Sequence, residues 1–154
     1  MKKVKRKLLK VIRDGIRKGF SHKKIAISIT LGVVIGIIPV YGLTTLMVSV
    51  LALSLRLNMV VMQVVHYILH PVQILLFIPF FKLGDMLLKD SNVDFSLAEY
   101  MHLFKTDFWG ALSEIWKLNL SALAIWVLIS IPLYIFMYRL SVYMIRRYVP
   151  VIAK

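Results

Sequence analysis

The sequence contains no cysteine among its 154 residues, which excludes disulfides, thiol nucleophiles and cysteine-ligated metal sites. Acidic residues are also scarce: seven Asp and Glu stand against 20 Lys and Arg, and all seven lie outside the long apolar runs of the chain. We find no Ser-His-Asp set, no paired carboxylates within an apolar run and no glycine-rich nucleotide loop. These absences remove the common catalytic machineries, so we expect a protein that is not an enzyme and uses no cofactor.

Charge is missing from three long stretches. Residues 25–55 contain no Asp, Glu, Lys, Arg or His, and residues 57–81 and 118–138 contain no Asp, Glu, Lys or Arg. About 20 apolar residues are enough to cross a bilayer as a helix, and 60% of the whole chain is hydrophobic. The composition therefore predicts an all-α integral membrane protein.

Positive charge is concentrated at the amino end. Eleven of the 20 Lys and Arg residues lie within residues 2–24, with a single acid. Apolar residues recur there at spacings of three or four, at Val4, Leu8, Val11, Ile12, Ile16 and Phe20. This pattern is typical of a helix on an anionic membrane surface, although a topology signal alone would also explain the charge. We expect residues 1–24 to form a basic amphipathic cytoplasmic arm that binds no nucleic acid.

Pro39 and Gly42 interrupt the first apolar run. They divide it into pieces of fourteen and thirteen residues, each about 20 Å long as a helix and too short for about 30 Å of hydrocarbon. The run is therefore expected to form either a re-entrant hairpin or two short spans, with its broken backbone buried in protein or facing a watery cavity. Pro71 predicts a second break, in a kinked span or another re-entrant element. Gly32 and Gly36 have the spacing of a close helix-packing motif.

The charge distribution predicts the orientation of the chain. Residues 82–117 carry four Lys and six Asp or Glu, whereas both ends of the chain are basic. Basic segments are retained in the cytoplasm, so we expect both termini there. The predicted parts after the arm are a membrane core (25–88), an amphipathic extracytoplasmic segment with a capping-box pattern at 96–99 (89–117), and a transmembrane helix with a basic tail (118–154).

Polar residues of the second run fall on one helical face. Gln63, His66 and His70 are three and four residues apart, and Gln73 follows the proline. Such a stripe should face protein or water and not lipid. The His-x-x-x-His spacing suits a metal, but no glutamate of a zinc-protease motif and no third ligand accompanies it, so no metal site is expected. Interhelical hydrogen bonding, proton transfer and contact with a lipid headgroup remain open as roles.

Further candidates lie beside the breaks in the apolar sequence. Thr44 and Thr45 open the second half of the first run, where free amides could hold a phosphate or carboxylate, or where the hydroxyls could cap the helix. Arg56 either snorkels to the headgroups or binds a lipid phosphate. Asn58 either caps the next helix or adds a hydrogen-bond donor.

Several of these residues together resemble a known family. Its motifs fall on Ile25 and Ala26, Gly32 and Gly36, Pro39 and Gly42, Arg56 and Asn58, Pro71, and Leu83 and Gly84. In this order they resemble the bacterial membrane family catalogued as domain of unknown function 2062, over residues 21–88. His70 stands where the family pattern has an asparagine. Related domains are attached to glycosyltransferases that use polyprenyl-phosphate carriers, so the resemblance implies an envelope-lipid or lipid-linked-sugar context.

The leading hypothesis is a small protein of the bacterial inner membrane that binds, and could flip or deliver, an anionic lipid such as a polyprenyl phosphate or a lipid-linked sugar. The expected ligand-binding residues are Arg56, Asn58, Thr44, Thr45, His66, His70 and Gln73. The phosphate is expected beside Arg56, Thr44 and Thr45, near the first helix break. The alternative is a scaffold or anchor, without transport, for a glycosyltransferase or other envelope enzyme. Because so short a chain encloses little volume, we expect a homo-oligomer.

Overall fold

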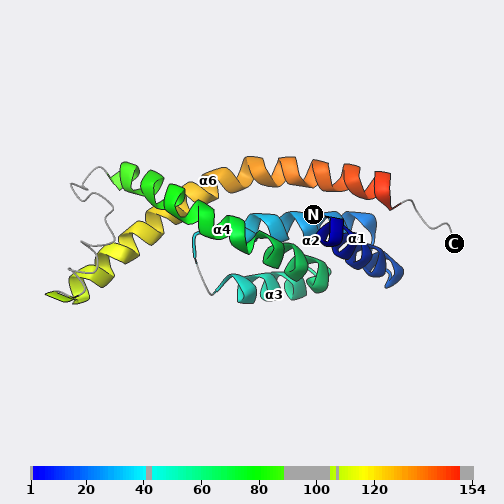
Figure 1. The fold of residues 1–154 in the computed structure, drawn as a ribbon, viewed down its shortest axis with the longest axis horizontal. Helices are drawn as coiled ribbons and strands as arrows, with labels where there is room; N and C mark the ends of the chain where they lie inside the picture. The colour runs from blue at the N-terminus through cyan, green and yellow to red at the C-terminus, as the bar shows by residue number, and fades with distance from the viewer. Residues whose placement is uncertain (1, 41–42, 89–104, 107, 150–154) are drawn as a thin grey trace.

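The computed structural model describes residues 2–40, 43–88, 105–106 and 108–149, which are helical apart from short turns and contain no strand. Its helices are α1 (Lys2–Arg17), α2 (His22–Gly36), α3 (Thr44–Ser54), α4 (Met59–Leu88) and α6 (Phe108–Tyr148) (Figure 1). The all-α prediction is confirmed. The predicted capping box at 96–99 and most of the predicted amphipathic segment lie outside the described residues.

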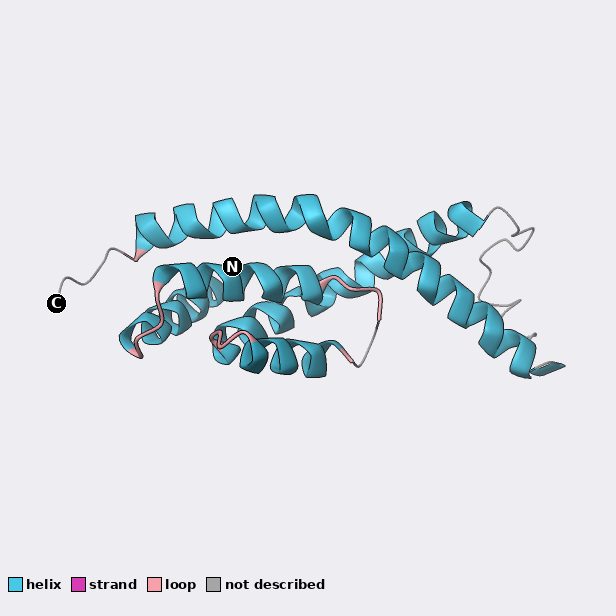
Figure 2. Cartoon of the chain, turned by 180° about the vertical axis from the view of Figure 1, so that it is seen from behind, coloured by secondary structure: helices cyan, strands magenta, loops and turns pink. Residues whose placement is uncertain are grey.

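The helices form an elongated molecule whose chain runs back and forth along the long axis (Figure 1). We term the end that holds α1 and the carboxyl end of α6 the basic end. From it α2 leads away and α3 returns, and the end of α2 and the start of α3 both lie well short of the far end. α4 then continues to the far end, and α6 comes back. Figure 2 shows from behind that the α1–α2 and α3–α4 turns lie toward the same end.

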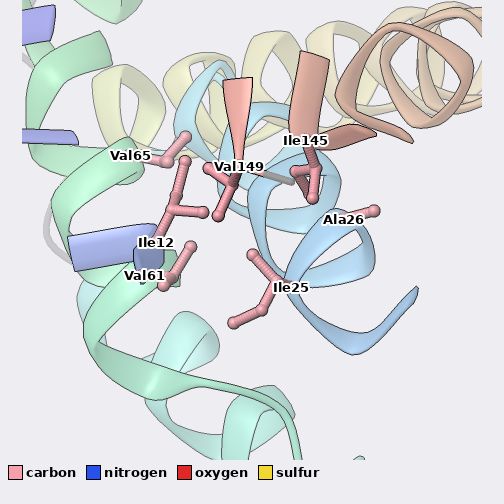
Figure 3. Close-up of a cluster of buried hydrophobic side chains, with 7 residues drawn as sticks. All are labelled: Ile12, Ile25, Ala26, Val61, Val65, Ile145 and Val149. Carbon is pink, nitrogen blue, oxygen red and sulfur yellow. The ribbon is translucent and has the colours of Figure 1, made fainter. Parts of the chain in front are cut away.

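One buried apolar cluster holds the basic end together. It comprises Ile12, Ile25, Ala26, Val61, Val65, Ile145 and Val149 (Figure 3). These residues come from α1, α2, α4 and the carboxyl end of α6, so the two ends of the described chain meet here. Leu8, Val11 and Ile16 of α1 also pack against the cluster. The apolar stripe that we expected on the membrane surface therefore packs, at least in part, against the protein itself.

Small residues let α2 approach α4 closely. A Cβ atom at Gly32 would lie 2.9 Å from the carbonyl oxygen of Met62, and one at Gly36 would lie 3.2 Å from Leu69 Cβ. Real Cβ atoms rarely tolerate such distances, because interiors are already close-packed. The interpretation of these glycines as a packing motif is confirmed.

A second close contact occurs where α4 and α6 cross, as Figures 1 and 2 both show. A Cβ atom at Gly84 would lie 2.6 Å from Ser121 Oγ and 2.9 Å from the backbone nitrogen of Ala122. Phe80 and Phe81 are buried beside Ala122 at this crossing. The contact fixes how the two longest helices cross.

Among the described residues, two segments are long and apolar enough to cross a membrane: Met59–Leu76 in α4 and Asn119–Arg147 in α6. Only 28% and 11% of these segments, respectively, are buried, whereas the core helix of a soluble protein would be mostly buried. Large apolar side chains instead face outward, for example Leu75 at 74% exposure and Leu128 at 66%. This pattern fits the membrane class predicted from composition.

Two predicted boundaries differ from the structure. α4 continues through Pro71 and Pro79, so the predicted helix break at Pro71 and its re-entrant form are wrong, whereas a kinked span is compatible with the continuous helix. α6 is one helix of 41 residues with Pro132 inside it, so the predicted boundary between residues 117 and 118 lies within a helix. A proline removes one backbone donor. When neighbouring turns and packed helices hold the chain on both sides, one lost bond does not end a membrane helix.

Candidate functional site

The structure interrupts the first apolar run between α2 and α3, and side chains of other helices bind the carbonyl groups that the interruption leaves open. Gln73 Nε2 donates to the carbonyl of Ile38 at 2.9 Å and lies 3.5 Å from that of Val40. Trp126 Nε1 donates to the carbonyl of Val34 at 3.0 Å. Gln73 is only 2% exposed, so this part of the broken backbone is buried in protein.

Of the two residues that predicted this interruption, Pro39 and Gly42, the structure describes only Pro39. Pro39 is fully buried, and Gly42 lies outside the described residues. Proline has no N–H to extend the α2 hydrogen-bond ladder. Because α2 ends before Pro39, the carbonyls of Ile38 and Val40 on either side of it lie outside a helix, and Gln73 Nε2 lies within hydrogen-bond distance of both.

The polar residues predicted on one face of α4 form a strip that we term the polar seam: Gln63, His66, His70 and Gln73. Gln63 Nε2 donates to Ser49 Oγ at 2.9 Å and to the carbonyl of Thr45 at 3.3 Å. His66 is fully buried, and its Nε2 lies 3.3 Å from Thr44 Oγ1. The seam therefore ties α4 to the first two turns of α3.

The centre of the seam is a pair of imidazoles. The rings of His66 and His70 meet edge to face, with centroids 4.9 Å apart. Within the described parts of the chain, no group of three or more His, Asp or Glu residues could hold a metal ion. The Thr44 hydroxyl contacts His66, and the N-cap of α3 has no side-chain hydrogen bond. Thr44 thus serves the seam and does not cap its own helix.

Arg56 lies in the turn between α3 and α4, in a left-handed backbone conformation with φ 51°. Its N–H donates to the carbonyl of Leu53 at 3.2 Å, and that of Leu57 donates to the carbonyl of Ala52 at 2.8 Å. These two bonds form a Schellman motif, in which glycine is the favoured residue at the position of Arg56. Lys24 Nζ donates to the Arg56 carbonyl at 3.1 Å, so α2 supports the turn.

Asn58 is the cap of α4. Its Oδ1 accepts a hydrogen bond from the N–H of Val61 at 3.0 Å, and its own N–H donates to Ser28 Oγ at 3.0 Å. A Cβ atom at Gly15 of α1 would lie 2.7 Å from Asn58 Nδ2. With 6% of its surface exposed, Asn58 serves the architecture of the turn, which was the capping alternative in the sequence analysis.

An open pocket of about 260 Å³ lies at the α1–α2 turn, with Lys24 in its lining. It is lined by Lys18, Gly19, Phe20, Ser21 and Lys24. Ser21 caps α2, with its Oγ accepting from the N–H of Lys24 at 3.2 Å. Two lysines and no acid line the pocket, so it favours an anion.

This pocket was not predicted from the sequence. A signal was present, because Gly19 follows a basic helix and Ser21 is a good helix cap. Together they predict a tight turn that gathers lysines at the start of α2.

We use the name basic turn for three cations from two turns: Lys18 and Lys24 at the α1–α2 turn, and Arg56 at the α3–α4 turn. The hydrogen bond from Lys24 Nζ to the Arg56 carbonyl connects the two turns.

The structure does not bring Arg56 to Thr44 and Thr45. The whole of α3 separates them, which corresponds to about 18 Å at the usual rise per residue. Thr44 is 2% exposed and lies against His66 of the polar seam, whereas Arg56 is exposed beyond the opposite end of α3. The three residues therefore do not form one phosphate site, and the predicted residues divide between the polar seam and the basic turn.

The comparisons with known proteins concern nearly the whole chain. Residues 5–151 match a family described as an uncharacterized protein conserved in bacteria, DUF2062. No curated protein and no solved structure gave a match. The matched range includes all of the polar seam and all of the basic turn. The chain therefore belongs to the DUF2062 family of bacterial proteins.

Proposed function

We propose that this protein lies in the bacterial inner membrane and binds the headgroup of an anionic lipid at the basic turn. The proposed ligand is a polyprenyl phosphate or a lipid-linked sugar, which the protein would flip or deliver. Both termini would lie in the cytoplasm, because both ends of the chain are basic. The α2–α3 pair would be re-entrant, a proposal supported by the position of its turn short of the far end (Figure 1).

The observation that carries the proposal is the conformation of Arg56. A left-handed backbone costs a residue other than glycine about 1 kcal/mol. The guanidinium is exposed, and it has no hydrogen bond or ion pair within the described part of the chain. A residue that strains the backbone, and whose side chain makes no hydrogen bond or ion pair within the described part of the chain, is better explained by a role of that side chain toward a ligand than by a role in the fold.

The surroundings of Arg56 favour a lipid over a free phosphate. Exposed apolar side chains flank it on both sides in the sequence, with Leu53 at 70% and Val60 at 58% exposure. Lys24 donates a hydrogen bond to the Arg56 carbonyl, and Lys18 lines the same pocket as Lys24. A phosphate could bind the guanidinium in a bidentate manner while its hydrocarbon chain lies along the apolar surface of α3 and α4. An amphiphile matches both halves of this surface.

The direct test measures binding of a fluorescent polyprenyl phosphate to the protein in neutral phosphatidylcholine nanodiscs. Arg56→Gly removes the guanidinium and inserts the residue that the backbone prefers, so the dissociation constant should rise about tenfold or more while thermal stability is kept. The dissociation constant of Arg56→Lys should lie between those of the natural protein and Arg56→Gly, because lysine retains the charge but cannot bind a phosphate in a bidentate manner. Arg139→Gln, which removes an exposed cation of α6, is the matched control.

The same binding measurement is then repeated in competition with the neutral polyprenol of the same chain length. It should compete poorly, because it lacks the phosphate that the basic turn binds. Unchanged affinity in Arg56→Gly, or equal competition by the neutral lipid, would contradict the proposal.

The scaffold function remains the second candidate. Trp109 and Trp116, near the start of α6, are 75% and 67% exposed, and exposed aromatic residues are typical anchors of protein interfaces as well as of membrane surfaces. A photocrosslinker at Trp109 should then capture a glycosyltransferase or other envelope enzyme in native membranes. A second copy of the chain captured there would instead support the homo-oligomer that a transport path through so small a fold requires.

A further inference from the structure

The polar seam contains buried hydrogen-bonding atoms with no partner among the described residues. They are Gln63 Oε1, His66 Nδ1 and Gln73 Oε1. Leaving such an atom unpaired costs about 1–3 kcal/mol, and native proteins pair nearly all of them. His66 and Gln73 are almost completely buried, at 0% and 2% exposure. Their open positions therefore point to an occupant that the chain does not itself provide.

The orientations of both glutamine amides are fixed by their other contacts. Gln73 Nε2 faces the carbonyls of Ile38 and Val40, and Gln63 Nε2 faces the carbonyl of Thr45. A carbonyl oxygen only accepts hydrogen bonds, so the –NH₂ group must point to it. Exchanging the nitrogen and oxygen of either amide would set two acceptors against each other. The open atoms of the two glutamines are therefore acceptors that require a donor.

The unpaired nitrogen of His66, Nδ1, can be either a hydrogen-bond donor or a hydrogen-bond acceptor. Its Nε2 contacts the Thr44 hydroxyl, which can donate or accept. In one tautomer Nδ1 is then an acceptor, and in the other it is a donor. A hydroxyl group or a water molecule satisfies both cases, whereas a phosphate oxygen satisfies only one.

The seam also lacks any cation that would attract an anion. No Lys or Arg occurs in residues 57–81 or within α3. An anionic headgroup would meet the two amide oxygens without a compensating charge. The chemistry of the seam is thus opposite to that of the basic turn, which lies beyond the other end of α3.

We propose that the polar seam is a binding site for hydrogen-bond donors, occupied by water or by the hydroxyl groups of lipid headgroups. Gln63 and Gln73 are ten residues apart, about 15 Å along a helix, so the site is elongated and extends to the break after α2. The pair of imidazoles lies between its two glutamines. The proposal does not depend on an anionic lipid at the basic turn.

Water-edited solid-state NMR of the protein in phosphatidylcholine bilayers tests the proposal without a mutation. This lipid has no hydrogen-bond donor, so only water can occupy the seam. With labelled His, Gln and Leu, magnetisation from water should reach the His66 ring and the Gln73 side chain several-fold faster than Leu75, which is 74% exposed on the outer face of α4.

A second sample containing phosphatidylglycerol separates the two sources of donors. Its glycerol hydroxyls can replace water, and they would then give headgroup-to-Gln73 contacts together with slower transfer from water. Transfer from water in both lipids identifies water as the occupant. The proposal is overturned if His66 and Gln73 receive magnetisation as slowly as Leu75 in phosphatidylcholine and show no headgroup contact in phosphatidylglycerol.

Discussion

Gln73 and Trp126 each bind a carbonyl group at or just past the end of α2 from a distant position in the sequence. The bonded pairs are 35 residues apart for Gln73 and Ile38, and 92 residues apart for Trp126 and Val34. An open carbonyl is costly where no water can reach it. At the scale of single residues, these side chains make the interrupted backbone of α2 compatible with an apolar environment.

Replacing Gln73 by leucine should lower the stability of the protein. Leucine is one bond shorter than glutamine and cannot donate, so the carbonyl of Ile38 would be buried without a partner at a cost of about 1–3 kcal/mol. The unfolding free energy in detergent micelles measures this loss. Ile74→Leu, at an exposed position of the same turn, is the control and should leave stability near that of the natural protein. A Gln73→Leu variant as stable as the control would contradict this role.

The sequence predicted those residue roles that depend on local spacing. Asn58 stands directly before a helical run, so its capping role could be inferred. The seam face of α4 followed from intervals of three and four residues. The partner of Gln73 could not be inferred, because it lies on another helix. The error concerning Arg56 and Thr44 has another origin: both flank one helix, and the length of that helix keeps them apart.

At the scale of elements, the same residue type has opposite effects in two helices. Pro39 follows the end of α2, whereas Pro71 lies inside a continuous α4. After Pro39 the chain turns, and Gln73 accommodates the carbonyls that are left open. At Pro71 the helix continues, with one backbone hydrogen bond fewer because proline has no N–H. A proline in the sequence therefore predicts a weak point, and the tertiary contacts decide whether the helix ends there.

Substitution of the two packing glycines of α2 should give graded effects. Gly32→Ala places a methyl group 2.9 Å from a backbone oxygen of α4, whereas Gly36→Ala meets the flexible side chain of Leu69 at 3.2 Å. Overpacking against the backbone should cost about 1–3 kcal/mol, and the cost at Gly36 should be smaller. Thermal unfolding of the two variants measures both. Equal stability of the two variants would indicate that α2 shifts freely against α4.

At the scale of the whole molecule, the charged and apolar surfaces are separated along the long axis. α1, the basic turn and Arg146 and Arg147 gather at the basic end, while α4 and α6 expose apolar faces along their candidate spans. The sequence predicted this separation from the positions of its charges. It did not predict the packing of α1 on α4 and α2, since an apolar stripe is equally suited to a lipid surface and to a protein surface.

Reporter fusions test the proposed orientation. Alkaline phosphatase, which is active only outside the cytoplasm, should be inactive when fused after residue 149 and active when inserted between residues 89 and 104. The reason is the excess of positive charge at both ends of the chain and its absence in residues 82–117. Green fluorescent protein at the same sites should give the opposite pattern. Phosphatase activity at the carboxyl end would contradict the proposal that both termini lie in the cytoplasm.

The central claim is that Arg56 recruits an anionic lipid to the basic turn. Native mass spectrometry of the protein, extracted gently from its own membrane, tests this most directly because the bound lipids are identified by mass. We expect a retained polyprenyl phosphate or other anionic lipid in the natural protein, and its loss in Arg56→Gly, with Arg139→Gln unaffected. Neutral bulk lipids alone, bound equally by all three proteins, would contradict the claim and favour the scaffold function.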